Sequence, residues 1–191
     1  MKKNINWTIR MIVEGGVMLA LAFLLDKIVL FKLPYGGSVT LARKLPLVIF
    51  AIRWGVKAGM VEGAMFGLLN MLIGGYVIHP VQAILDYILA AAAIGLAGIK
   101  FGDEKKATSY LPSIILSFFV SGIFNVISGQ IFFYSMTSAA EAGFDKFILY
   151  NIALNYSVLL GDMAILLIIY LITYKSLSSL YKDQRELKVN R

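Results

Sequence analysis

A single carboxylate lies inside a long apolar run near the middle of the chain. The run extends from His79 to Gly98, reads HPVQAILDYILAAAAIGLAG, and has Asp86 as its only acidic residue. Helical spacing places Gln82 and Asp86 on one face, with Tyr87 about 100° around the helix from Asp86. An aspartate at the centre of a membrane helix costs about 2.5 to 3.5 kcal/mol. A carboxylate kept at that cost favours a functional role for Asp86.

A structural role for Asp86 is the alternative. The carboxylate could pair with Arg43, Lys44, Asn125 or Asn155 and link helices inside the bundle, or it could remain protonated and neutral. Arg43 and Lys44 lie near the external end of a short apolar span, and long basic side chains at such a place are expected to reach the lipid headgroups.

Polar and aromatic residues on three other apolar segments are expected to converge on Asp86. Helical spacing places them in the same half of the bundle. Such a pocket offers one anion, several amides and phenols, and aromatic rings, which suits a small, flat, cationic heteroaromatic ligand. Besides Gln82, Asp86 and Tyr87, the candidate residues are Phe66, Asn125, Gly129, Phe133, Tyr150 and Asn155.

The elements that must carry these residues are membrane helices. Hydrophobic residues make up 59% of the 191 residues, mean hydropathy is +0.79, and 15% of the residues are charged. Soluble domains have roughly 25% charged residues. We therefore predict an all-α membrane protein, a six-transmembrane-helix bundle forming one integral membrane substrate-binding domain over residues 1–191. The predicted spans are 9–31, 41–53, 56–73, 76–99, 111–133 and 147–174.

The basic residues orient this bundle. With both termini in the cytoplasm, 13 of the 18 lysines and arginines fall on the cytoplasmic side, as the positive-inside rule requires. The net charge of +7 is thus explained by topology, with no need for a nucleic-acid partner. The chain has no cysteine and one histidine, and it carries neither a Walker motif nor a catalytic triad or zinc motif. We expect neither an enzyme nor a metal site.

Two further features have a structural and a functional interpretation. Residues 31–40, FKLPYGGSVT, contain a proline and two glycines and predict an external loop, which is either an ordinary connection or a lid over a binding site. Gly16 and Ala20 share one helix face, where small residues allow close approach of another helix. That helix could belong to this chain or to another subunit.

Four motifs together resemble one family. HPVQAILDYILAAAAIGLAG, NVISGQIFF, LYNIALNYSVLL and EGGVMLALAF, which cover most of the chain in one register, are similar to the thiamine-binding S components of energy-coupling factor (ECF) vitamin transporters. The resemblance implies a prokaryotic cell-membrane subunit that captures thiamine from outside. It also implies two kinds of partner, a transmembrane T component and two ATPase subunits that use ATP, with no cofactor in this chain.

The resemblance also implies roles for particular residues. It makes Asp86, Tyr87, Gly129, Tyr150 and Asn155 ligand contacts. It makes the first external loop a gate, with Tyr35, Gly36 and Gly37, and it makes Gly16 and Ala20 the docking face.

The chain departs from some relatives at the pocket. Asn125 stands where they have histidine, and Gly37, Phe66 and Phe133 stand where they have tryptophan. Phenylalanine keeps a stacking face with a weaker cation–π interaction. The ligand could therefore be another vitamin or a thiamine-related pyrimidine. An autonomous proton-coupled vitamin transporter, with Asp86 or Asp162 as proton relay, is a further alternative.

Overall fold

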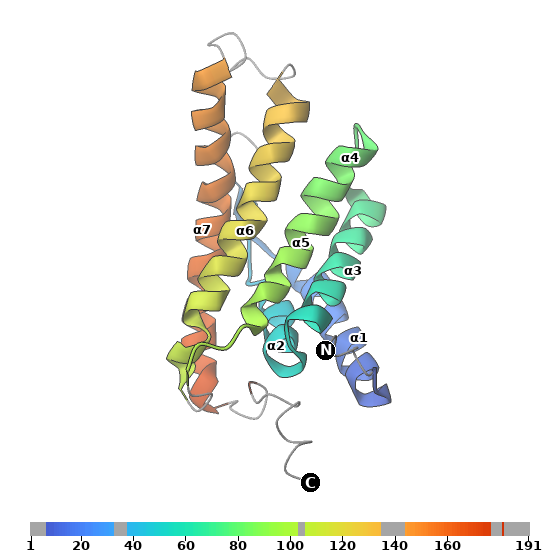
Figure 1. The fold of residues 1–191 in the computed structure, drawn as a ribbon, viewed down its shortest axis with the longest axis vertical. Helices are drawn as coiled ribbons and strands as arrows, with labels where there is room; N and C mark the ends of the chain where they lie inside the picture. The colour runs from blue at the N-terminus through green and yellow to red at the C-terminus, as the bar shows by residue number, and fades with distance from the viewer. Residues whose placement is uncertain (1–6, 33–37, 103–105, 135–143, 177–180, 182–191) are drawn as a thin grey trace, which may run out of the picture.

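Helices make up most of the computed structural model, which describes residues 7–32, 38–102, 106–134, 144–176 and 181 (Figure 1). Two of the long helices, helix 80–98 and helix 111–133, are composite, because each joins stretches of different helical geometry. The elements are α1 (Ile9–Asp26), β1 (Val29–Lys32), β2 (Ser38–Thr40), α2 (Leu45–Trp54), α3 (Val56–Gly74), α4 (Pro80–Ala83), the π-helical η1 (Ile84–Leu89), α5 (Ala90–Ala92), the 3-10 segments η2 (Ala93–Gly98) and η3 (Ala107–Ser109), α6 (Leu111–Ser128), the π-helical η4 (Gly129–Phe133) and α7 (Phe144–Ser176).

Four helices among the described residues are long and apolar enough to cross a membrane. They are Val56–Gly74, Pro80–Gly98, Leu111–Phe133 and Lys146–Ser176. The helix α1 carries three charged residues within 18 positions, and α2 has only ten residues. By length and composition, the structure thus supports four of the six predicted spans.

The short helix α2 lies inside the bundle. Its residues from Pro46 to Arg53 are all buried, and it packs against α1, α3 and η2. A helix that is apolar on every side is one that other protein elements surround. Its shortness is therefore compatible with a membrane protein, because neighbouring helices and not lipid cover it.

The prediction that the first helix continues to Phe31 is wrong. The helix α1 ends at Asp26, and Val29–Lys32 forms an antiparallel hairpin with Ser38–Thr40 in the register Val29↔Thr40, Phe31↔Val39 and Lys32↔Ser38. The run from Val29 to Phe31 is apolar enough to continue a membrane helix, but β-branched and aromatic residues also favour strands when a partner strand is available. The expected gate residues Tyr35, Gly36 and Gly37 lie outside the described residues.

Close packing of α3 positions helix 80–98. Glycines recur every fourth residue along one face of α3, and a Cβ on Gly63 or Gly67 would overlap the backbone carbonyl of Ala91 or Tyr87. Small residues at this spacing let two helix backbones approach closely. This contact holds the segment that carries Asp86 and Tyr87 against α3.

One carboxylate in the first half of α1 connects this helix to α2. Glu14 accepts hydrogen bonds from Arg53 Nε (3.0 Å) and Nη2 (2.9 Å), from Trp54 Nε1 (2.8 Å) and from Arg10 Nε (2.9 Å). These bonds link the first half of α1 to the last turn of α2. The other face of α1, which includes Gly16 and Ala20, is exposed.

Candidate functional site

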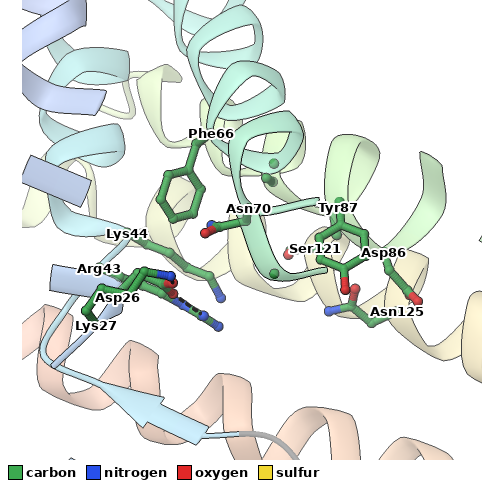
Figure 2. A pocket seen from close by; sticks show the side chains of 14 residues that line it. Asp26, Lys27, Arg43, Lys44, Phe66, Asn70, Asp86, Tyr87, Ser121 and Asn125 are labelled. Carbon is green, nitrogen blue, oxygen red and sulfur yellow. Dashed lines mark hydrogen bonds and ion pairs between the residues drawn. The ribbon is translucent and has the colours of Figure 1, made fainter. Parts of the chain in front are cut away.

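Two cavities of ligand size lie between the helices and meet at Asp86 and Asn125. The first has a volume of about 280 Å³ and the second about 310 Å³. Asp26, Lys27, Arg43, Lys44, Phe66, Gly67, Asn70, Gly74, Asp86, Tyr87, Ala90, Ala91, Ser121 and Asn125 line the first cavity (Figure 2). Asp86, Asn125, Gly129, Phe133, Phe147, Tyr150, Asn151, Leu154 and Asn155 line the second.

The structure brings eight of the nine expected binding residues to the walls of these cavities. The exception is Gln82, which lies one turn from Asp86 and lines neither cavity. Its Nε2 atom donates to Asp86 Oδ2 at 2.8 Å and to the Tyr76 carbonyl at 3.2 Å, and its Oε1 atom accepts from the Ile78 amide at 3.2 Å. Gln82 therefore orients the carboxylate.

Asp86 has no cationic partner among the described residues. Its carboxylate accepts a hydrogen bond from the neutral Gln82 side chain and is half-buried. Arg43 and Lys44, two of the partners that a structural role would require, pair with other carboxylates. A partly desolvated anion facing a cavity, with a neutral hydrogen-bond partner, is suited to receive a cationic ligand.

Both composite helices change to π-helical geometry at the cavities. The segment η1 contains Asp86 and Tyr87, and η4 extends from Gly129 to Phe133. Single π-helical turns inside α-helices occur frequently at functional sites, because the extra residue turns side chains away from the regular helix faces. In this chain, the two turns face the same pair of cavities.

Aromatic side chains are present in both cavities. Tyr87 donates to the Tyr76 carbonyl at 3.4 Å and accepts from the Tyr76 amide at 2.7 Å through the same hydroxyl oxygen. In the second cavity, Tyr150 lies 6.1 Å from Phe147 between ring centroids, and Phe133 lies 6.3 Å from Tyr76. These rings provide flat surfaces for a heteroaromatic ligand.

Asn151 is a polar residue of the second cavity that was not among the expected binding residues. It is 4% exposed, donates to the Val126 carbonyl at 2.8 Å, and accepts from Asn155 Nδ2 at 2.7 Å. A Cβ on Gly129 would overlap the Asn151 amide. Gly129 thus makes room for Asn151, which in turn orients Asn155. The four-residue spacing from Asn151 to Asn155 is the sequence signal for this pair.

The other group that sequence reasoning missed is a basic wall of the first cavity. Arg43 Nη1 lies 2.7 Å from Asp26 Oδ1, while Arg43 Nε and Lys44 Nζ lie 3.4 Å and 3.6 Å from Asp162 Oδ2. Figure 2 shows these basic side chains opposite Asp86 and Tyr87. The expectation that they reach the lipid headgroups is wrong, because the half-buried Asp26 of α1 and the buried Asp162 of α7 pair with them inside the bundle.

A metal centre finds no support in the part of the chain that the structure describes. No three histidine, aspartate or glutamate side chains there lie close enough together to hold a metal ion. The cavity walls carry carboxylate, amide, phenol and aromatic ring groups.

Apolar helices long enough to span a membrane, with partly open cavities of polar and aromatic lining between them, are typical of multi-pass membrane proteins that bind or transport small molecules. The family model described as "Thiamine transporter protein (Thia_YuaJ)" matches residues 12–182, and the chain belongs to this family. The family is one of transport proteins, in agreement with the expectation that the chain is not an enzyme.

Two curated relatives carry the same name. The thiamine transporter ThiT of Bacillus subtilis (strain 168) is 31% identical over 187 residues, covering 91% of this chain and 95% of the relative. ThiT of Lacticaseibacillus paracasei is 31% identical over 102 residues, covering 46% of this chain and 51% of the relative. A solved structure of ThiT from Listeria monocytogenes superposes with a TM-score of 0.72 at 24% identity, covering 90% of this chain and 97% of that one, and supports the fold.

Proposed function

We propose that this protein binds thiamine on the outer side of the cell membrane, as the substrate-binding S component of an ECF transporter. The observation that carries the proposal is Asp86, a half-buried carboxylate without a cationic partner among the described residues, at the junction of two cavities. Thiamine has a positively charged ring and a neutral aminopyrimidine. A cavity with one free anion, amides and aromatic rings matches both parts.

Each group of the site has a distinct proposed contribution. Asp86 offers an ion pair or a charge-assisted hydrogen bond, Asn125 and Asn155 offer hydrogen bonds, and Tyr87 and Tyr150 offer phenol groups and ring faces. Phe66 and Phe133 add stacking surfaces. Small-molecule sites commonly have volumes of about 300 to 1,000 Å³, and the two cavities together fall in that range.

The proposal includes a topology and a gate. The whole chain, 1–191, would form a single membrane domain with six membrane-embedded helices, both termini in the cytoplasm and the cavities open toward the outside. The segment Tyr35–Gly37, which falls between β1 and β2 in the sequence, would open for thiamine and close over it. The two strands of the hairpin connect this segment to α1 and α2.

Transport would require partners. The proposed partners are a transmembrane T component and two ATPase subunits, with ATP used there and no cofactor bound by this chain. The exposed face of α1 supports a docking role, because a Cβ on Gly16 would meet nothing within 4 Å and Ala20 is exposed. Internal packing therefore does not explain these two small residues within the described part of the chain.

A thiamine-related pyrimidine is the second candidate ligand. It is favoured by Asn125, Phe66 and Phe133, which stand in the cavity walls where some relatives have histidine and tryptophans. These residues keep hydrogen bonding and stacking but provide a weaker attraction for a positive ring.

Isothermal titration of the detergent-purified chain with thiamine tests the proposal. We expect saturable binding of one thiamine per chain and an increase in melting temperature, because a ligand that binds only the folded state stabilises it. Binding of another vitamin or of the isolated pyrimidine, with no heat and no thermal shift for thiamine at micromolar concentration, would overturn the assignment.

A further inference from the structure

The first cavity presents an electrostatic problem for a cationic ligand. Arg43 and Lys44 line it, opposite Asp86, and both carry positive charge. A like charge across a cavity with little water is strongly unfavourable, since Coulomb energies grow as the effective dielectric constant falls. The basic wall must therefore be neutralised if thiamine is to bind beside it.

Asp162 contacts both basic side chains without lining either cavity. It lies in α7, is 2% exposed, and places Oδ2 3.4 Å from Arg43 Nε and 3.6 Å from Lys44 Nζ. Asp26 gives Arg43 a second carboxylate contact at 2.7 Å. Asp26 also pairs with Lys27 at 3.2 Å, so among the described residues Asp162 is the carboxylate that pairs with Lys44 and the second one that contacts Arg43.

The same carboxylate fixes the backbone that carries these cations. Asp162 Oδ1 accepts from the Thr40 amide at 2.9 Å and from Thr40 Oγ1 at 3.3 Å. One residue away, Val39 packs directly on Gly161, where a Cβ would overlap its side chain. Thr40 and Val39 are fully buried, so β2 is anchored on α7.

The chain between β2 and the basic wall is short and tightly turned. Ala42 adopts a left-handed conformation (φ 51°), its amide bonds to the Thr40 carbonyl at 2.8 Å, and its carbonyl accepts from the Leu45 amide at 2.8 Å. With so little free chain, the position of Thr40 on Asp162 also determines where Arg43 and Lys44 lie. Lys44 Nζ is held further by the Phe118 ring, 4.6 Å from its centroid.

We propose that Asp162 is a positioning residue that makes the first cavity selective for cationic ligands. It would do so by neutralising Arg43 and Lys44 and by holding them, through Thr40, against the wall. This inference rests on the proposed function, in which the ligand is a cation. Asp162 acts through the basic pair and does not contact the ligand.

The test compares two ligands of the same shape and different charge. Binding of thiamine and of 3-deazathiamine, an uncharged isostere in which carbon replaces the charged ring nitrogen, is measured by titration for the wild type and for Asp162→Asn. We expect the variant to lose on the order of tenfold more affinity for thiamine than for the isostere, the scale of one unit charge across a small cavity. The double variant Asp162→Asn with Lys44→Met should restore the wild-type ratio of the two affinities.

The control and the second variant keep the test decisive. Glu14→Gln removes a carboxylate that also binds an arginine, in the first half of α1 and away from both cavities, and should leave the ratio unchanged. Lys44→Met alone should shift the ratio toward thiamine, and this measurement decides the matter if Asp162→Asn does not fold. Equal losses for both ligands, or a ratio that neither variant changes, would overturn the inference. Failure of the wild type to bind thiamine would instead overturn the proposed function on which it rests.

Discussion

Asp86 is the acidic residue that the sequence singles out, and in the structure it lines both cavities, where the proposed cationic ligand would bind. Its side chain is oriented by Gln82 at 2.8 Å, while Arg43 and Lys44 are engaged by Asp26 and Asp162. Neither of the cations that could have paired with Asp86 in a structural role is its partner. The charge on Asp86 is therefore available to a ligand.

The first prediction concerns that charge. Asp86→Asn keeps the size of the side chain and its bond with Gln82 but removes the anion, so we expect thiamine affinity to fall by about 1.5 to 3 kcal/mol, or roughly 10- to 150-fold. Titration of the purified variant measures this loss. Asp86→Glu, which keeps the charge on a longer side chain, should lose less. Unchanged affinity in Asp86→Asn would show that the carboxylate has a structural role.

Gly129 allows a second prediction. Because a methyl group there would overlap the Asn151 amide, Gly129→Ala should displace Asn151 and, with it, the hydrogen bond to Asn155. We expect at least about a tenfold loss of thiamine affinity, the effect of about 1.4 kcal/mol, from misplacing these amides. Gly16→Ala adds the same methyl group where nothing lies within 4 Å and should bind normally. Normal binding by both variants would contradict the role given to Gly129.

At the scale of elements, the site depends on departures from regular helix. The π-helical turns η1 and η4 contain four of the expected binding residues, Asp86, Tyr87, Gly129 and Phe133, and the β1–β2 hairpin replaces the end of the first predicted helix. Buried ion pairs then hold the hairpin and the start of α2 against α7. Cavities form because these segments interrupt an otherwise close-packed bundle.

The exposed face of α1 is the element for which we predict a partner. Gly16→Leu or Ala20→Leu places a large side chain on this face without a neighbour inside the chain, so purified protein should bind thiamine normally. Uptake by cells that contain the complete transporter should be lost, since close helix approach requires small residues. Loss of thiamine binding together with uptake would indicate that this face packs within the chain.

At the scale of the whole molecule, four helices meet the length and hydropathy of membrane spans and two do not. The short α2 is enclosed by α1, α3 and η2, and α1 has one exposed apolar face that continues past Gly16 and Ala20. The bundle is thus asymmetric: α1 and α2 pack together near one end of it, beside the longer helices (Figure 1).

Topology can be tested directly because the chain contains no cysteine. Val77 and Lys106 are exposed and lie in connections at opposite ends of helix 80–98. With both termini in the cytoplasm, we expect Val77→Cys to react with a membrane-impermeant maleimide in intact cells, and Lys106→Cys to react only after the cells are opened. The reverse pattern would place the cavities on the cytoplasmic side.

Sequence alone determined the class of the protein and pointed to eight of the residues that line the two cavities. Hydropathy defines Leu111–Phe133 with the same bounds as the structure and Val56–Gly74 to within a residue, because apolar length is a local property. Helical spacing likewise grouped Asp86, Asn125 and Asn155 correctly, since residues one turn apart share a face whatever surrounds the helix.

Tertiary contacts decided the features that no local sequence pattern contains, namely the strand pairing and the position of the basic side chains. The strand Val29–Lys32 exists because Ser38–Thr40 lies beside it, and the inward position of Arg43 and Lys44 depends on Asp162, more than a hundred residues later in the chain. Lysine and arginine reach water or lipid headgroups unless a buried carboxylate pairs with them, and such pairing arises only when the helices pack. The charge balance of the cavity is therefore a property of the assembled bundle.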